Sequence, residues 1–203
     1  TEDEWQVNRQ PWQGEAHAAI LGLPGSGFEA VPLTWIDGPT GCGKDQLIAA
    51  AALSILHDAP EGFRCVMYST DHDRSRDVIS AVAGFCRRTE AINVGDGIEF
   101  TRNEIRNKTR DVTVTCEPCD GASASGARAD LFVLNEVQSW KDPHGFRVWT
   151  ETMARFGKKR AGRFVVLSNL PFHPIGDWRR DAWEVARKGV GWNYMAVRLT
   201  DCP

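Results

Sequence analysis

The sequence is poor in the features that mark secreted and membrane proteins. Its six cysteines are too few and too scattered for a disulfide scaffold. No run approaches the roughly 20 apolar residues that a membrane-spanning helix needs, and the polar first residues are unlike a signal peptide. We therefore expect a cytosolic protein with no membrane partner.

A strong net charge and a zinc signature are also missing. The formal charge of −3 argues against a uniformly basic coat for nucleic acid, although it leaves room for local basic patches. Cys116 and Cys119 form a C-x-x-C pair, but no second pair or nearby histidines match it, which disfavours zinc. With 203 residues, 42% of them hydrophobic, the chain can bury one sizeable core.

What the sequence does contain is a glycine-rich segment, GPTGCGKD, at residues 38–45. A β-branched and aromatic run precedes it and an alanine-rich run follows, which is the strand, loop and helix context of a phosphate-binding loop. Gly38, Gly41 and Gly43 permit backbone angles that turn successive N–H groups toward phosphate oxygens. Lys44 opens the helix, where its ammonium can reach the β- and γ-phosphates. The alternative is an ordinary glycine turn with a lysine at a helix start.

The residue after that lysine departs from the phosphate-loop pattern. G-x-x-x-x-G-K-S/T places a hydroxyl there for Mg²⁺, whereas this chain has Asp45. The other residues that complete the predicted nucleotide-binding loop are Pro39, Thr40, Cys42 and Gln46.

A candidate base-reading site precedes the loop. Pro11 should end an extended lead-in and place Trp12 and Gln13 at a helix start. The indole of Trp12 can stack on adenine, and the amide of Gln13 can both donate to and accept from the edge of the ring. The alternative is a Trp packed on the core beside a solvent-exposed Gln.

Further along, apolar strands alternate with amphipathic helices. Strands are predicted near residues 65–69, 129–136, 164–167 and 192–199, and helices near 44–57, 146–156 and 177–188. This α/β alternation predicts a mostly parallel central sheet with helices on both faces, for which nucleotide sites lie at the carboxyl ends of strands.

Two of these strands end in polar residues. Asn135 and Glu136 close the run at 129–136, a position that suits metal and water chemistry beside a phosphate loop, although a plain strand end is the alternative. Ser168 and Asn169 follow the strand at 164–167. They can sense a γ-phosphate, although Ser-Asn before a proline is equally common turn chemistry.

A basic cluster lies between two short predicted strands at 98–100 and 112–115. It is a candidate contact for DNA phosphates, and a solvated hairpin face is the alternative. Its members are Arg102, Arg106, Lys108 and Arg110.

With these residues in order, the chain resembles the ATPase domain of the large terminase subunit, the DNA-packaging motor of tailed bacteriophages. Residues 11–13 stand in the place of the adenine motif, 38–45 of Walker A, 126–140 of Walker B and 165–169 of the coupling motif, while 69–74 open the next helix. The order and spacing of the motifs carry the resemblance, which spans nearly the whole chain.

The resemblance implies a P-loop NTPase of the additional-strand (ASCE) class that uses ATP and Mg²⁺ to move double-stranded DNA into a procapsid. It implies a homo-oligomeric ring on the phage portal in the host cytoplasm, together with the small terminase subunit. A single ATPase domain would span 1–203, with the adenine motif in 1–30 and the core in 31–200. The family's C-terminal nuclease domain is not expected within it.

The resemblance also implies residue roles. Lys44 would hold the phosphates, Glu136 would activate water, and Ser168 with Asn169 would couple hydrolysis to movement. The metal site would comprise Glu136 together with Asp45 and Asn135, which replace the usual hydroxyl and carboxylate.

The position of the arginine finger is a third departure from the family pattern. Ser125 stands just before Gly126, where some relatives carry the finger, and Arg128 is the nearest substitute. Arg128 would act on a neighbouring subunit, unless it is a surface arginine at the start of a strand.

Two other functions compete with the packaging motor. A helicase-like translocase shares these motifs, although a second RecA-like domain is missing. A degenerate nucleotide-binding scaffold without hydrolysis would explain the two substituted metal positions, but the retained Lys44 and Glu136 argue against it.

Overall fold

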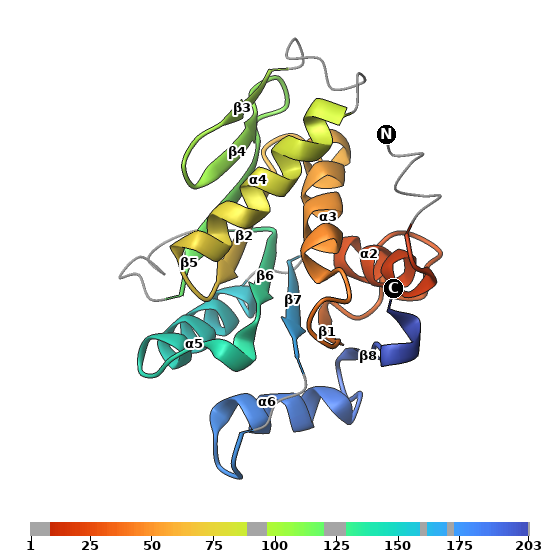
Figure 1. Cartoon of the computed structure of the whole chain (residues 1–203), viewed down its shortest axis with the longest axis vertical. Coiled ribbons are helices and arrows are strands. Elements are labelled where there is room, and N and C mark those ends of the chain that lie inside the picture. The colour runs from red at the N-terminus through yellow and green to blue at the C-terminus, as the bar shows by residue number, and fades with distance from the viewer. Residues whose placement is uncertain (1–8, 89–96, 120–128, 159–161, 170–172, 203) are drawn as a thin grey trace.

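A mostly parallel β-sheet forms the centre of the protein (Figure 1). In this computed structural model, which describes residues 9–88, 97–119, 129–158, 162–169 and 173–202, the sheet has eight strands in the order β3-β4-β5-β2-β6-β7-β1-β8. The parallel strands are β1 (Leu33–Asp37), β2 (Arg64–Ser69), β5 (Val112–Pro118), β6 (Leu131–Asn135), β7 (Arg163–Ser168) and β8 (Asn193–Ala196). At one edge, β3 (Ile98–Phe100) and β4 (Glu104–Asn107) form an antiparallel hairpin.

Helices cover both faces of the sheet, as predicted. One face packs against α2 (Pro11–Leu21), α3 (Lys44–Asp58) and α4 (His72–Arg88), and the other against α5 (His144–Phe156) and α6 (Trp178–Arg187). Short 3-10 turns, η2 (Val137–Ser139) and η3 (Leu199–Asp201), follow β6 and β8. Within the described residues, no helix combines the length and apolarity needed to cross a membrane.

The strand order contains the additional strand that the resemblance implied, because β7 lies between β1 and β6. In the register of these strands, Asp37 is level with Ser168, and Asn135 is level with Leu167. The carboxyl ends of all three strands therefore meet at one edge, where the phosphate loop begins.

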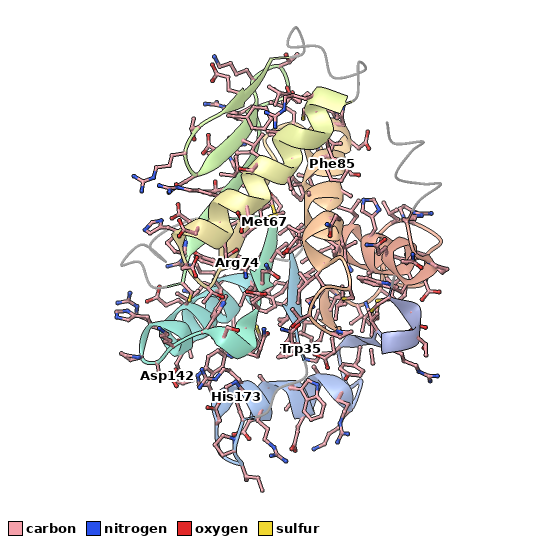
Figure 2. The ribbon with its side chains drawn as sticks, in the orientation of Figure 1. Trp35, Met67, Arg74, Phe85, Asp142 and His173 are labelled. Atoms are coloured by element: carbon pink, nitrogen blue, oxygen red, sulfur yellow. The ribbon has the colours of Figure 1, made fainter. Side chains whose placement is uncertain are left out.

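Strand alternation explains the two cores. Successive residues of a strand point to opposite faces, so Ile36, Val133 and Leu167 pack under α3 while Trp35 and Phe132 pack toward α5 and α6. Figure 2 labels Trp35 among the side chains between the sheet and α6.

Two segments differ from the sequence prediction. The segment between residues 100 and 112 contains β4, which was missed because Ile105 is its one apolar residue. Ile105 is buried, and Asn107 on the same face donates from Nδ2 to Leu56 O at 3.0 Å, so the strand is fixed by one apolar and one polar contact. Helix α5 begins at His144, two residues before the helix predicted from residue 146.

Most of the predicted basic cluster is engaged within the protein. Arg106 pairs with Asp111 at 2.7 Å, and Lys108 pairs with Glu99. Arg110 donates to carbonyls at the end of α3, with Nη2 at 2.8 Å from Ala59 O, so it acts as a helix cap. This hairpin therefore carries less free positive charge for DNA than the sequence alone suggests.

Helix α2 is fixed against α3 and the sheet. Pro11 occupies its first turn, as predicted, and Gln10 and Gln13 form a capping box. Arg163 of β7 donates from Nη2 to Ala19 O at 2.8 Å and to two carbonyls of the following loop. His17 reaches Ser54 of α3, with 3.0 Å between Nε2 and Oγ.

The docking of α2 should weaken in acid. Burial, with help from the charge of Arg9, lowers the pKa of His17 to about 4. Because this pKa lies below that of the unfolded chain, His17 contributes stability above pH ~6.5 that is lost as pH falls toward about 4. The free energy of unfolding should drop by up to about 3 kcal/mol over that window, measured by urea denaturation.

A non-titrating variant separates this effect from general acid denaturation. His17→Gln should flatten the fall in stability between pH 6.5 and 4, whereas His144→Gln, at an exposed position on α5, should not change it. An unaltered slope in His17→Gln would show that another group is responsible.

Candidate active site

The phosphate loop joins β1 to the N-terminus of α3. Gly38 N donates to Ser168 O at 3.0 Å, which fixes the start of the loop against β7. Gly41 and Gly43 have φ values of 81° and 91°, in the region that side chains other than glycine rarely adopt. The loop thus ends in a left-handed glycine at the start of a 15-residue helix, whose dipole favours anions.

The ammonium of Lys44 lies inside this loop, and the side chain is only 7% exposed. It donates to Gly38 O and Pro39 O, both at 2.9 Å, and to Asn169 Oδ1 at 2.7 Å. These three oxygens satisfy its three protons. Asn169 also donates from Nδ2 to Thr40 Oγ1 at 3.2 Å. Lys44 therefore connects the phosphate loop to the tip of β7.

The predicted adenine motif also contacts the loop. Gln13 donates from Nε2 to Gly43 O at 3.2 Å and accepts from Gln10 N at 2.9 Å. Gln13 is 7% exposed, so the alternative of a solvent-exposed glutamine is wrong. Trp12 packs in the core cluster with Ile20, as that alternative predicted, and its base-stacking role stays a prediction.

The end of β6 presents an unpaired polar atom. Alternation along the strand places Asn135 on the face of Leu131 and Val133, under α3. The residue is 3% exposed, and its Oδ1 has no hydrogen-bond partner among the described residues. Such an atom costs about 1–3 kcal/mol unless water, an ion or a ligand reaches it. Asn135 is therefore suited to hold a metal-bound water.

Glu136 has an unusual backbone. Its φ of 55° lies in the left-handed region, which costs a residue with a side chain about 1–3 kcal/mol. The surrounding contacts hold it there, since Glu136 N donates to Leu167 O at 2.9 Å and Ser139 N donates to Glu136 O at 2.8 Å. Strain of this kind gathers at active sites, which agrees with the role predicted for this carboxylate.

A divalent ion at this edge would take few protein ligands. Asp45 is exposed on the first turn of α3, and Asn135 and Glu136 follow from β6. No group of three or more His, Cys, Asp or Glu side chains converges in the part of the chain that is described. The oxygen donors nevertheless fit Mg²⁺, which usually keeps several waters and binds one or two carboxylates plus phosphates.

The predicted coupling pair is tied to the Walker B segment. Asn169 N donates to Gln138 Oε1 at 3.0 Å, and the one proton of Ser168 Oγ is shared between Gln138 Oε1 at 3.0 Å and Asn169 O at 2.7 Å. Ser168 is buried, whereas Gln138 is half-buried on η2. No role is predicted for Gln138 from the sequence, and the signal that could have found it is its position two residues after Glu136 in the Walker B segment.

Asp37 is a second residue that sequence reasoning missed. It is buried at the end of β1 and accepts from Trp35 Nε1 at 2.8 Å, Trp183 Nε1 at 2.5 Å and Tyr194 OH at 2.7 Å. Burial raises the pKa of its carboxyl, and the three donors oppose that rise. Alternation points Asp37 away from the phosphate loop, so it anchors α6 and β8 to β1.

The remaining predicted residues have different surroundings. Cys42 is buried, so its thiol faces the core, while Gln46 is exposed on α3. Arg128 lies outside the described residues, and its role as a trans-acting finger stays a prediction.

Comparisons with known proteins agree with this geometry at the level of the fold. No protein-family model matches the chain, and no curated protein is significantly similar to it in sequence. Solved structures do match, and together with the strand order they define a P-loop ATPase fold.

Large terminases are prominent among these structures. The HK97 bacteriophage large terminase has a TM-score of 0.74 at 15% identity over 92% of this chain, which spans only 38% of that protein. The ATPase domain of the Thermus phage P74-26 large terminase has a TM-score of 0.67 at 14% identity, covering 89% of this chain and 78% of that one. The resemblance read from the sequence is thus confirmed for the fold.

Two further similar structures are a complex with a nucleotide and a protein from outside the terminases. The large terminase of a thermophilic bacteriophage, solved in complex with ADP, has a TM-score of 0.68 at 12% identity, covering 95% of this chain and 46% of that one. A DEAD box protein from Methanococcus jannaschii has a TM-score of 0.56 at 10% identity, covering 85% and 47% respectively.

Proposed function

We propose that this chain hydrolyses ATP with Mg²⁺ and that hydrolysis drives the packaging of double-stranded DNA. The observation that carries the hydrolysis proposal is the convergence of Lys44, Asn135 with Glu136, and Asn169 at the ends of three adjacent strands. The likeness to terminase ATPase domains favours a packaging motor over other tasks. Such a motor would work as a ring at a phage portal in the host cytoplasm, with the small terminase subunit.

In this proposal the phosphates bind across the N-terminus of α3. Their oxygens take over the protons that Lys44 now donates to Gly38, Pro39 and Asn169. The N–H groups of the loop and the helix dipole add positive potential. Gln13 is hydrogen-bonded to Gly43 at the end of the loop, and the base of the bound nucleotide would lie beside it.

Hydrolysis then depends on the end of β6. The carboxylate of Glu136 orients and deprotonates the attacking water, and the amide of Asn135 holds a water beside it. Bound Mg²⁺ would neutralise charge on the β- and γ-phosphates, with Asp45, Asn135 and Glu136 as its protein-side donors.

The two substitutions at the metal site compensate each other in charge. A hydroxyl has become Asp45 on the loop side, and a carboxylate has become Asn135 on the β6 side. We infer that Asp45 supplies the metal-site carboxylate. Mg²⁺ tolerates this because it accepts a water between itself and a protein carboxylate.

This swap predicts a non-additive pair of variants. Asp45→Ser alone should reduce Mg²⁺-dependent turnover by about tenfold or more, and adding Asn135→Asp should restore much of it. Steady-state phosphate release at several Mg²⁺ concentrations measures both effects. Strictly additive losses, or an unchanged metal requirement in Asp45→Ser, would mean that the carboxylate has not been relocated.

The Asp45 carboxylate should also affect nucleotide binding when no metal ion is present. Without a cation, Asp45 repels the nucleotide, so Asp45→Ser should bind ATP more tightly than wild type in EDTA. Asp58→Ser, at the opposite end of α3, serves as the matched control.

We further propose that Arg128 acts across a subunit interface. Mixed assemblies of Arg128→Ala and Glu136→Gln subunits should then recover turnover, because some interfaces pair an intact arginine with an intact carboxylate. Arg147→Ala, an arginine exposed on α5, is the comparison for general effects of losing a charge. Mixed assemblies that stay as inactive as either parent would remove Arg128 from this role.

Turnover in defined assemblies tests the proposed function as a whole. We expect phosphate release from ATP by protein mounted on a portal, stimulated by double-stranded DNA. Stimulation by single-stranded nucleic acid instead would favour the helicase-like function, which the DEAD box likeness supports. Nucleotide binding without turnover in every assembly would indicate a non-hydrolysing scaffold.

A further inference from the structure

The side-chain oxygen of Gln138 accepts hydrogen bonds that connect the turn after β6 to the end of β7. Gln138 Oε1 accepts from the Asn169 amide at 3.0 Å and lies 3.0 Å from the Ser168 hydroxyl, whose one proton it shares with Asn169 O at 2.7 Å, although both residues lie about thirty residues later in the chain. Among the described residues, Gln138 Nε2 donates to Ser139 Oγ alone, at 3.3 Å on the exposed side. The side-chain oxygen therefore makes the long-range contacts, and the side-chain nitrogen makes a local one.

Gln138 also belongs to a rigid turn that contains Glu136. Ser139 N donates to Glu136 O at 2.8 Å, and Trp140 Nε1 donates to Asn135 O at 2.9 Å. The Gln138 carbonyl lies 2.8 Å from His173 Nε2, at the approach to α6 (Figure 2). These bonds connect residues 135–140 to one another, so we expect a shift of Gln138 to move Glu136 as well.

Lys44 lies at the other end of this series of hydrogen bonds. Asn169 accepts from Lys44 through its side-chain Oδ1 at 2.7 Å while its backbone N–H binds Gln138. A phosphate oxygen that takes a proton of Lys44 competes directly with Asn169. The hydrogen bonds thus run without a gap from Lys44 through Asn169 to Gln138 and its turn.

We propose that Gln138 is a positioning residue that sets the Glu136 carboxylate according to whether Lys44 binds Asn169 or phosphate. The inference rests on the proposed hydrolysis and names the link between phosphate binding and water activation. With Lys44 on Asn169, the β7 tip and η2 are held in the arrangement seen here. When phosphate takes Lys44, Asn169 is free to move, and Gln138 carries that movement to Glu136.

The test compares three variants in the full chain. Gln138→Met keeps the length of the side chain and removes its acceptor. Gln138→Glu keeps an acceptor for Ser168 and Asn169. Ser139→Ala removes only the local partner of Nε2 and is the matched control.

We expect a split between turnover and binding. Gln138→Met should lower kcat by about 10- to 100-fold with ATP affinity within about threefold of wild type, because a misplaced catalytic group affects the rate and not phosphate binding. Gln138→Glu should retain most of the rate, and Ser139→Ala all of it. Equal rates in Gln138→Met and wild type, or equal losses in the Met and Glu variants, would overturn the inference.

A second measurement needs no hydrolysis. In wild type, the NMR resonance of the Asn169 backbone amide should shift on adding ATP-γ-S with Mg²⁺ but not AMP, while the amide stays protected from hydrogen exchange because its bond to Gln138 is kept. In Gln138→Met the amide should be unprotected throughout. A resonance unchanged by ATP-γ-S in a protein that binds it would overturn the link. If the amide responds as expected while wild type shows no turnover in any assembly, the proposed hydrolysis fails and the link stands.

Discussion

Glu136→Gln should give a protein that binds ATP and does not hydrolyse it. The amide keeps the size and hydrogen-bonding reach of the side chain but cannot accept the proton of the attacking water. We expect turnover to fall by about 10²- to 10⁴-fold, the range for loss of a general base. The strained backbone at φ 55° should be retained, because the bonds to Leu167 O and from Ser139 N use main-chain atoms.

Equilibrium binding of a fluorescent ATP analogue and phosphate release check this result together. Glu184→Gln, which removes a carboxylate on α6 that pairs with Arg180, is a matched control and should leave both unchanged. A comparable loss of binding in Glu136→Gln would mean that the carboxylate holds the nucleotide rather than activating water.

Lys44→Ala should lose nucleotide binding itself. The ammonium is the one side-chain cation shown inside the phosphate loop among the described residues, and it already donates to three oxygens at 2.7 to 2.9 Å. Hydrogen bonds to charged groups are worth about 1.5–3 kcal/mol each, so losing two to phosphate should weaken binding by at least about 100-fold.

Folding must be monitored in this variant, because Gly38 O, Pro39 O and Asn169 Oδ1 lose their shared donor. Lys44→Met keeps the apolar stem and should bind as poorly as Lys44→Ala while unfolding closer to wild type. Lys141→Ala, at an exposed lysine after η2, should bind normally. Retained affinity in a folded Lys44→Met protein would place the nucleotide elsewhere.

Local pattern was enough to predict the parts of the site that belong to one segment. The strand, loop and helix around residues 38–45 follow from a β-branched and aromatic run, an alanine-rich run of helical length and the glycines that the turn requires. The polar residues that end β6 and β7 could be placed beside the loop because parallel strands share a carboxyl edge.

Contacts between distant segments could not be predicted from local sequence pattern. Gln138 and Asp37 receive donors from residues far along the chain, and nothing in their own neighbourhoods marks those partners. Likewise, β4 pairs through backbone bonds around a single apolar side chain, Ile105, so no alternation was visible. Arg110 was predicted as surface charge, yet it caps α3 because the hairpin folds against that helix.

A structure of the protein with Mg²⁺ and ATP-γ-S tests most directly whether these strand ends form one nucleotide site. We expect Lys44 Nζ within hydrogen-bond distance of β- and γ-phosphate oxygens, its bond to Asn169 Oδ1 broken, and the Glu136 carboxylate facing the γ-phosphate. A nucleotide bound away from residues 38–45, or bound there with Lys44 still on Gly38 O, Pro39 O and Asn169 Oδ1, would contradict that arrangement.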